Sequence, residues 1–433
     1  MHHTHNYQQT NLLDFNTYGF NLKGDKLVIM SKEIDWHNII PQVETLYSNK
    51  TGRNSNSIRT MIGLEMGKTW YGVSDKIIVN MLKTDVSLMV LCGFEAPPTA
   101  KEVPSSNSMT DFRNRLTPEV LNAINSAIIQ KEIRKLPPRK RTQVASDTTC
   151  MEANIEYPTD VRLMTKVYKK FVTIATEVRG SSKDLLIRGK HNIKNKLNSF
   201  NKRRKHKKKE INNLLSELIS FSKTLQTQLQ DKQYDLKKKH KQLLTNGMKI
   251  IKQQQTMLEK GLKSIPNRIV SFHEQDLRPI YRGKLKAATE FGKKVSIMVV
   301  GQALIIPGEF TYNNVSDTKL PEKDVKRFKE VTGRNIKEYT ADRGMHSPQT
   351  HKLMEANNIT DGIAYKGKVP KTAKLPPKIT RKRLNNQRQP VEGKFGTLKT
   401  RYGCRKIPYK ADNTEVRVGF GIMMHNLAWG IKH

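Results

Sequence analysis

Three acidic side chains occupy positions at which a carboxylate can take part in catalysis. Asp147 and Asp342 each follow a short run of β-compatible residues, and Glu392 lies in a segment that can form a helix. Two strand ends and a facing helix can bring three oxygen ligands to one point. We therefore predict that Asp147, Asp342 and Glu392 form one acidic site.

Three converging carboxylates suit a pair of divalent metal ions. Mg²⁺ prefers hard oxygen ligands, and Mn²⁺ accepts the same ligands. Two such ions, about 3.5–4 Å apart, support in-line displacement at phosphorus by activating the attacking oxygen and stabilising the leaving oxygen. The predicted cofactors are two Mg²⁺ ions, for which Mn²⁺ would substitute.

The charge of the chain indicates a polyanionic partner. The 433 residues include 78 Lys and Arg against 39 Asp and Glu, a formal net charge of +39, which fits nucleic acid or an anionic membrane surface. The longest apolar stretch, Val295–Pro307, contains Ser and Gln and is too short to span a bilayer. The N-terminus is polar and shows no secretory signal. We expect nucleic acid as the partner and no membrane.

The cysteines indicate a reducing compartment. Cys92, Cys150 and Cys404 are far apart in the sequence and form no CxxC pair. This spacing argues against a disulfide framework and against a structural zinc site.

The first third of the chain reads as helical. After an N-terminal tail at 1–36, apolar residues recur at three- and four-residue spacing in Ile58–Met66, Ser74–Cys92 and Pro118–Ile133. Residues 37–135 are therefore predicted to form a helical domain. We expect this domain to bind DNA, although the same pattern fits a purely structural bundle.

A mixed α/β texture follows in two segments, 136–190 and 265–412. Predicted strands are Val144–Cys150, Arg268–Phe272, Lys294–Val300, Ala303–Ile306, Glu338–Ala341 and Gly362–Tyr365. Predicted helices are Asp160–Val178, Pro321–Thr332, Pro348–Ala356 and Leu384–Arg401, with Leu375–Arg383 as a loop. A C-terminal helix is predicted within 413–433.

Residues 191–264 are predicted to form an inserted coiled-coil helical hairpin. Apolar residues follow alternating three-four spacing from Ile211 to Leu229, and the pattern resumes from Leu244 to Leu258 after a change of phase near Lys232–Lys241. The spacing fits a hairpin that folds back on itself and equally one that joins two chains.

A dense run of positive charge opens this insertion. Seven of the eight residues in Lys202–Lys209 are Lys or Arg. A solvated helix face is one interpretation. In so basic a protein we favour contact with DNA phosphate by Lys202, Arg203, Arg204 and Lys205.

Several blocks of the sequence resemble bacterial insertion-sequence transposases of the DDE type. Residues 147–160 (DTTCMEANIEYPTD) are similar to the first-aspartate motif of that family, and residues 341–346 (ADRGMH) are similar to the second. Residues 273–284 resemble its central block, and residues 52–115 resemble its helical N-terminal region.

The segment around Glu392 resembles the Y-(2)-R-(3)-E-(6)-K signature of one large group of these enzymes. Arg388 stands four residues before Glu392, and Lys399 stands seven after it, as the signature requires. Asn385 occupies the Tyr position, a departure that bears on the positioning of DNA.

The resemblance implies an RNase H-like catalytic core, with the helical N-terminal domain before it and the coiled-coil hairpin inserted into it. Asp147, Asp342 and Glu392 would be both catalytic residues and metal ligands. The implied activity is cleavage and strand transfer at the terminal inverted repeats of a mobile element. The implied partners are double-stranded end and target DNA and a second copy of the chain, and the implied location is the bacterial cytoplasm, at the nucleoid.

Basic residues near the motifs are expected to contact DNA. Arg388 and Lys399 would hold phosphates on either side of the cut bond, and Arg343 directly follows the second aspartate. A predicted DNA-facing hairpin adds Arg278, Arg282 and Lys284.

Some assignments stay open. Asp160 competes as a ligand but reads better as part of a helix cap, Thr148 is a candidate support for the site, and His346 fits a proton shuttle and a turn histidine equally. The alternative functions are a catalytically inactive, transposase-derived DNA-binding protein and a coiled-coil scaffold that binds nucleic acid nonspecifically.

Overall fold

The computed structural model describes residues 22–48, 54–178, 189–230, 234–281, 289–311, 316–371, 373, 375–408 and 413–433. The chain divides into two compact units. Unit 1 comprises residues 1–154 and 293–433, and unit 2 comprises residues 155–292. Within the described ranges, no helix has both the length and the apolar character needed to cross a membrane.

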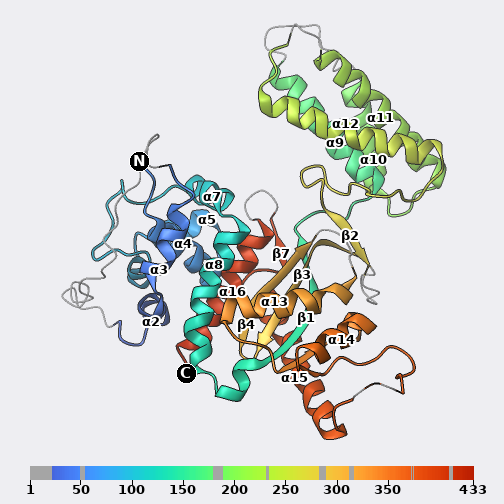
Figure 1. Ribbon diagram of the computed structural model, residues 1–433. Helices are drawn as coiled ribbons and strands as arrows, with labels where there is room; N and C mark the ends of the chain where they lie inside the picture. Colours follow the sequence, from blue (N-terminus) through green and yellow to red (C-terminus); the bar gives the residue numbers. More distant parts are fainter. Residues whose placement is uncertain are drawn as a thin grey trace. The chain divides into compact units, whose positions relative to one another are not determined.

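Unit 1 opens with short helices (Figure 1). They are α2 (Lys26–Glu33), α3 (Trp36–Glu44), α4 (Ile58–Tyr71), α5 (Asp75–Met81), α6 (Val86–Leu91), α7 (Ser106–Arg115) and α8 (Pro118–Glu132). Ser57, Ser74 and Ser105 cap α4, α5 and α7 by accepting a bond from a backbone N–H of the first turn. The predicted tail at 1–36 differs from the structure in its last part, because α2 buries Leu27 and Met30.

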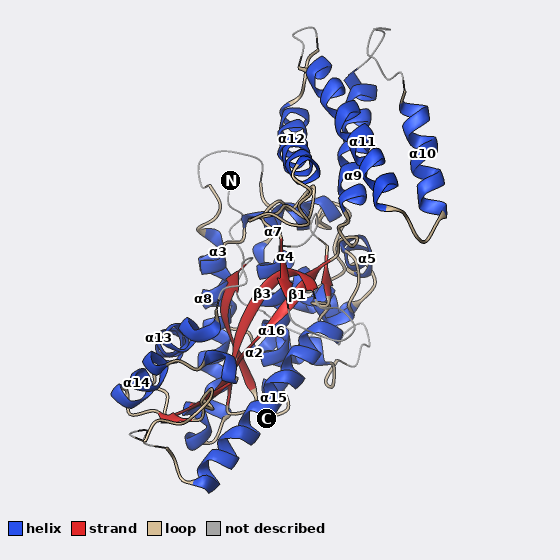
Figure 2. Cartoon of the chain, turned by 90° about the vertical axis from the view of Figure 1, so that its right-hand side faces the viewer, coloured by secondary structure: helices blue, strands red, loops and turns tan. Residues whose placement is uncertain are grey.

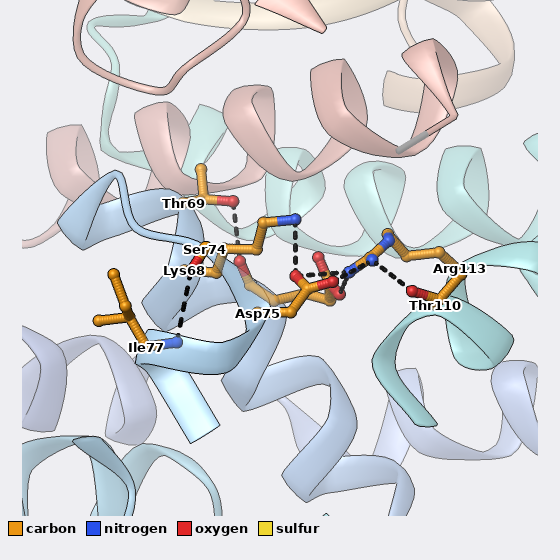
Figure 3. Close-up of polar contacts among 8 residues, drawn as sticks. Lys68, Thr69, Ser74, Asp75, Ile77, Thr110 and Arg113 are labelled. Carbon is orange, nitrogen blue, oxygen red and sulfur yellow. Dashed lines mark hydrogen bonds and ion pairs between the residues drawn. The ribbon is translucent and has the colours of Figure 1, made fainter. Parts of the chain in front are cut away.

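A buried group of charged side chains joins α4, α5 and α7 (Figure 3). Arg113 donates to the carboxylates of Glu65 and Asp75, and Lys68 Nζ lies 2.9 Å from Asp75 Oδ1. Two cations therefore balance two anions, which offsets the cost of burying charge. Although burial opposes ionisation of Asp75, Arg113 and Lys68 hold the pKa of Asp75 below its usual value.

The described residues form a mixed sheet. Its strands are β1 (Gln143–Ala153), β2 (Arg278–Tyr281), β3 (Thr289–Val300), β4 (Leu304–Thr311), β5 (Glu338–Ala341), β6 (Thr360–Asp361) and β7 (Lys406–Ile407). The order is β2-β3-β1-β5-β6, with β4 also on β3 and β7 also on β1. β1, β5 and β6 run parallel, whereas β3 and β4 are antiparallel. This mixed arrangement is consistent with an RNase H-like core.

Alternate residues of the strands face two different cores. Val144 and Tyr339 belong to the core with α13 (Leu320–Thr332) and α14 (Pro348–Ala356). Ala145 belongs to the core with α15 (Lys378–Thr400) and α16 (Thr414–Gly430). Figure 2 shows these strands with helices on both sides. Because side chains alternate along a strand, each position is assigned to one face.

The N-terminal helices and the sheet share one apolar core. The core with α15 and α16 also contains Met30 of α2 and Leu64 of α4, and α16 packs against both α8 and β4. Asn426 of α16 accepts from Ile305 N at 2.8 Å and donates to Ile305 O at 2.9 Å, which satisfies backbone groups of β4. The regions predicted as separate domains, 37–135 and 413–433, are therefore parts of one compact unit.

Some predicted elements have different limits. Gly362–Tyr365 lies after β6 instead of forming it, and α15 begins within the predicted loop Leu375–Arg383. Arg268–Phe272 forms no strand, because the backbone N–H and carbonyl of Ile269 both bond the side-chain amide of Gln253. By contrast, Glu338–Ala341 and Pro348–Ala356 have the predicted limits.

The helices of unit 2 form a bundle. Its helices are α9 (Asp160–Val178), α10 (Lys190–Lys202), α11 (Lys208–Leu229) and α12 (Lys238–Glu259). Helices α9, α11 and α12 pack against one another, and α10 packs against α11. They share an apolar core that includes Phe171, Leu218 and Ile251.

This bundle differs from the predicted hairpin. Helix α9, which prediction placed in the catalytic core segment 136–190, buries its apolar face against α11 and α12. Leu218, Leu225 and Leu229 of the predicted coiled-coil stripe are each at most 1% exposed. These leucines are therefore buried within the bundle, and they are not exposed to pair with a second chain.

Candidate active site

Asp147 and Asp342 occupy neighbouring positions on parallel strands. In the pairing of β1 with β5, Ser146 lies opposite Ala341, and each aspartate is the next residue along. Paired strands lie about 4.8 Å apart. The two aspartates are 195 residues apart in the sequence. They therefore stand side by side where β5 ends.

Helix α15 lies over the face of the sheet to which both aspartates belong. Arg388 Nη1 donates to Asp342 Oδ1 at 2.7 Å, and Lys399 Nζ donates to Thr149 Oγ1 at 2.9 Å. Thr149 is two residues after Asp147, so it shares the face of Asp147. The buried side of α15 carries Leu384, Gln387, Val391, Phe395 and Leu398.

Glu392 lies on α15 between these two contacts. It follows Arg388 by four residues and precedes Lys399 by seven, and such spacings place side chains on one flank of a helix. Glu392 is exposed. Its carboxylate is therefore presented on the flank from which Arg388 and Lys399 reach the sheet.

The Arg388–Asp342 ion pair compensates part of the negative charge at this edge. Side-by-side carboxylates repel each other, and a nearby cation offsets part of this repulsion. The Arg388 side chain is 33% exposed and that of Asp342 is 53% exposed. Exposed ion pairs contribute little stability, so Arg388 can exchange Asp342 for another partner at low cost.

The three carboxylates are ligands of the chemical type that a hard divalent cation prefers. Carboxylate oxygens are the ligands that Mg²⁺ and Mn²⁺ prefer. Among the residues that the structure describes, no three His, Cys, Asp or Glu side chains lie close enough together to hold one ion. The convergence of Asp147, Asp342 and Glu392 on metal therefore stays a prediction.

A further carboxylate, Asp317 of η3 (Asp317–Lys319), borders the same edge. A Cβ at Gly344 would lie 3.5 Å from Asp342 Oδ2 and 3.9 Å from Asp317 Oδ2. Asp317 accepts from Thr148 Oγ1 at 3.2 Å and pairs with Lys294 Nζ at 2.6 Å. Sequence spacing did not indicate this contact, because tertiary folding alone joins these segments.

His346 is part of a hydrogen-bonded chain. Its Nδ1 lies 2.7 Å from Nε2 of His351, whose Nδ1 bonds the carboxylate of Asp361. The ring of His351 stacks on Tyr365 with centroids 4.0 Å apart. Desolvation and the nearby His351 lower the pKa of His346. These bonds favour the turn-histidine interpretation of His346.

Asp160 is engaged within unit 2. Its Oδ1 accepts from Arg268 Nη2 at 2.7 Å, and Thr159 Oγ1 accepts from the N–H of Arg162 in the first turn of α9. Thr159 thus caps the helix, and Asp160 supports the adjacent segment.

The remaining predicted DNA contacts have varied surroundings. Arg278 donates to the backbone oxygens of Gln275 and Leu277, so its guanidinium is engaged within its own loop. Arg282 and Lys284 lie outside the described residues. The exposed predicted residues are Lys202, Arg203, Arg204, Lys205 and Arg343.

Comparison with known proteins identifies two matched regions. The family model described as "Transposase domain (DUF772)" matches residues 16–115, and the one described as "Transposase DDE domain" matches residues 271–427. A Rhizobium meliloti protein, "Uncharacterized protein ORF8 in nfe locus", is 29% identical over 123 residues. That match covers 28% of this chain and 59% of the relative. No solved structure matches the chain.

Proposed function

Because the chain belongs to the transposase family with a DUF772-type N-terminal domain and a DDE domain, we propose that it cuts and joins DNA at the ends of a mobile element. The reaction would begin with hydrolysis of a phosphodiester at each terminal inverted repeat. The freed 3′-hydroxyl would then attack a phosphodiester of target DNA, forming one P–O bond as another breaks.

The observation that carries this proposal is the pairing of β1 with β5 beneath α15. It sets Asp147 beside Asp342, and α15 presents Glu392 between Arg388 and Lys399. Three carboxylates within one region of a strongly basic chain suit chemistry on a phosphodiester.

Each side chain has a proposed role. Asp147, Asp342 and Glu392 would hold two Mg²⁺ or Mn²⁺ ions, which supply activation of the attacking oxygen and stabilisation of the leaving oxygen. Arg388 would leave Asp342 for a phosphate beside the cut bond, and Lys399 would bind a phosphate on the other side.

The wider assembly is also part of the proposal. Both element ends must be held together, so a homodimer is expected. The helices of residues 37–135 and the exposed basic residues Lys202–Lys205 would bind the inverted repeats and target DNA. The proposed location is the bacterial cytoplasm, at the nucleoid.

Replacing each carboxylate tests the catalytic assignment. Asp147→Asn, Asp342→Asn and Glu392→Gln keep the side-chain shape and remove the charge. Each should lower cleavage of a linear DNA carrying the inverted repeats by at least about a thousandfold, because metal-assisted stabilisation is worth several kcal/mol. Cleavage by the purified full chain in Mg²⁺ or Mn²⁺ is the measurement.

A matched control is Glu322→Gln, an exposed carboxylate of α13 on the opposite face of the sheet. It should cleave as the unaltered chain does. Unchanged cleavage by Asp147→Asn would overturn the catalytic assignment. Binding of the repeats without any cleavage by the unaltered chain would favour the inactive DNA-binding alternative.

A further inference from the structure

A groove lies in unit 1 along the first part of α15. Its volume is about 490 Å³. It is lined by Arg139, Lys140, Gln143, Gln302, Ile379, Lys382, Arg383, Asn386 and Gln387. Except for Ile379, every lining side chain is a cation or an amide, which is the composition of a surface that binds anionic polymers.

Four elements from three distant parts of the sequence build this groove. The short helix η2 (Pro138–Thr142) supplies Arg139 and Lys140, β1 supplies Gln143, the turn between β3 and β4 supplies Gln302, and α15 supplies the rest. A Cβ at Gly301 would lie 3.0 Å from both Cβ and the carbonyl oxygen of Lys140. The absence of a side chain at Gly301 therefore lets this turn close against η2.

Gln302 has an unusual backbone conformation at the rim. Its φ is +67°, a left-handed value that non-glycine residues rarely adopt. Gly301 has a φ of +56°, so the two residues make the tight turn together. A glycine would adopt this conformation more easily than Gln302 does.

The groove has an excess of positive charge. Its neighbouring carboxylate, Glu338, accepts from Arg383 at 2.6 and 2.9 Å and lies 3.6 Å from Arg139. Despite burial, Arg383 lowers the pKa of Glu338. Lys140 and Lys382 are exposed and have no ion pair with any described residue.

The groove and the carboxylate site share one helix and one face of the sheet. Lys382 to Gln387 precede Glu392 by ten to five residues on α15. At a rise of 1.5 Å per residue, this separation is about 8–15 Å along the helix axis. Phosphates of one DNA strand advance about 3.4 Å per nucleotide along the duplex axis. For a duplex whose axis runs along α15, this separation corresponds to about two to five nucleotides from a phosphate at Glu392.

We propose that this groove binds the sugar–phosphate backbone of duplex DNA two to five nucleotides from the cut phosphate. The inference rests on the proposed function, and it adds a contact site to the catalytic one. Lys140 and Lys382 neutralise phosphates, and the amide of Gln302 donates to them. Ile379, a residue that is 85% exposed, packs against a deoxyribose.

Removing the two unpaired lysines tests the charge of the groove. The double variant Lys140→Ala, Lys382→Ala should bind end DNA more weakly. The slope of log affinity against log salt should become shallower by about two, because each lost phosphate contact changes it by about one. The control is Lys326→Ala, Lys329→Ala, two exposed lysines of α13 on the other face of the sheet. An equal slope for both double variants would overturn the proposal.

Cross-linking tests the position of the groove. The three cysteines of the sequence are all buried, so Lys382→Cys creates an exposed and selectively reactive thiol. With DNA that carries a thiol tether at single phosphates, disulfides should form two to five nucleotides from the cut. Lys326→Cys should not react there. Disulfides formed only at more distant phosphates would contradict the proposed placement.

These outcomes separate the inference from the proposed function. If the unaltered chain does not cleave DNA, the proposed function fails. If it cleaves and the lysine variants keep both salt slope and cleavage, only the groove assignment fails.

Discussion

At the scale of single residues, two glycines of α15 bear on the site. A Cβ at Gly393 or Gly396 would meet no neighbouring heavy atom within 4 Å. Glycine in the interior of a helix costs about 1 kcal/mol relative to alanine, so neither residue is explained by packing. Gly396 follows Glu392 by four residues and precedes Lys399 by three, which places it on their flank. Gly393 is rotated from Glu392 by roughly 100°.

Alanine at these two positions should separate stability from activity. Both Gly393→Ala and Gly396→Ala should raise the free energy of unfolding of unit 1 by about 0.5–1 kcal/mol. Only Gly396→Ala should slow DNA cleavage, because its methyl group stands where DNA would approach Glu392. Urea unfolding followed by tryptophan fluorescence reports unit 1, since Trp36, Trp70 and Trp429 all belong to it. Equal cleavage by both variants would count against close approach of DNA at this flank.

At the scale of secondary-structure elements, the helical bundle of unit 2 depends on the fit between α9 and α12. Gly247 lies inside α12, and a Cβ there would overlap the ring of Phe171 and lie 3.3 Å from Val167 Cγ1. Phe171 is 0% exposed, so its ring has little room to move. The glycine therefore serves helix packing, unlike the exposed glycines of α15.

Alanine at position 247 should destabilise unit 2. In an unobstructed helix, Gly247→Ala would stabilise by about 1 kcal/mol. Here overpacking should reverse the sign and cost about 1–3 kcal/mol. Hydrogen exchange of α9 and α12 peptides in the full chain measures the local opening free energy. Lys249→Ala, at an exposed position of the same helix, is the control, and slower exchange in Gly247→Ala would refute the packing argument.

At the scale of the whole molecule, α16 links the N-terminal helices to the sheet. His425 of α16 lies 3.0 Å from the carbonyl oxygen of Ala303 through Nε2. Burial, with the positive charge of Lys394, lowers the pKa of His425 to about 4. On the other face, burial raises the pKa of Asp324, which accepts from Tyr339, to about 6.

These two groups should give unit 1 opposite pH dependences. The unfolded chain binds a proton at His425 below about pH 6.5, whereas the folded chain does so only near pH 4. His425 therefore destabilises the fold as pH falls from about 6.5 to 4, by up to about 3 kcal/mol. The stability gained by His425→Gln, which retains an N–H donor, should grow over that fall in pH.

The sign is reversed for Asp324. The folded chain holds this proton up to about pH 6, whereas the unfolded chain releases it near pH 4. The stability gained by Asp324→Asn should therefore grow as pH rises through this range. Tryptophan-detected unfolding of each variant against the unaltered chain isolates each contribution. A pH-independent difference for His425→Gln would contradict a neutral buried imidazole.

Local sequence spacing by itself predicts the limits of several helices and strands. The limits of α9, β5 and α14 follow from short-range pattern, because helix and strand periodicity is expressed within a few residues. The spacing of Arg388, Glu392 and Lys399 likewise places them on one flank of a helix without reference to the rest of the chain. Net charge alone indicated a polyanionic partner. The roles of the three carboxylates stay a prediction.

Tertiary structure decided what depends on long-range contact. An apolar helical face does not specify its partner, so only packing could assign α9 to the bundle and join the N-terminal helices to the sheet. The pairing of β1 with β5 sets Asp147 beside Asp342. Other long-range contacts bring Asp317 to this edge and Lys140 to Lys382 across a groove. Such contacts arise when strands and helices bury complementary faces, and no short segment encodes them by itself.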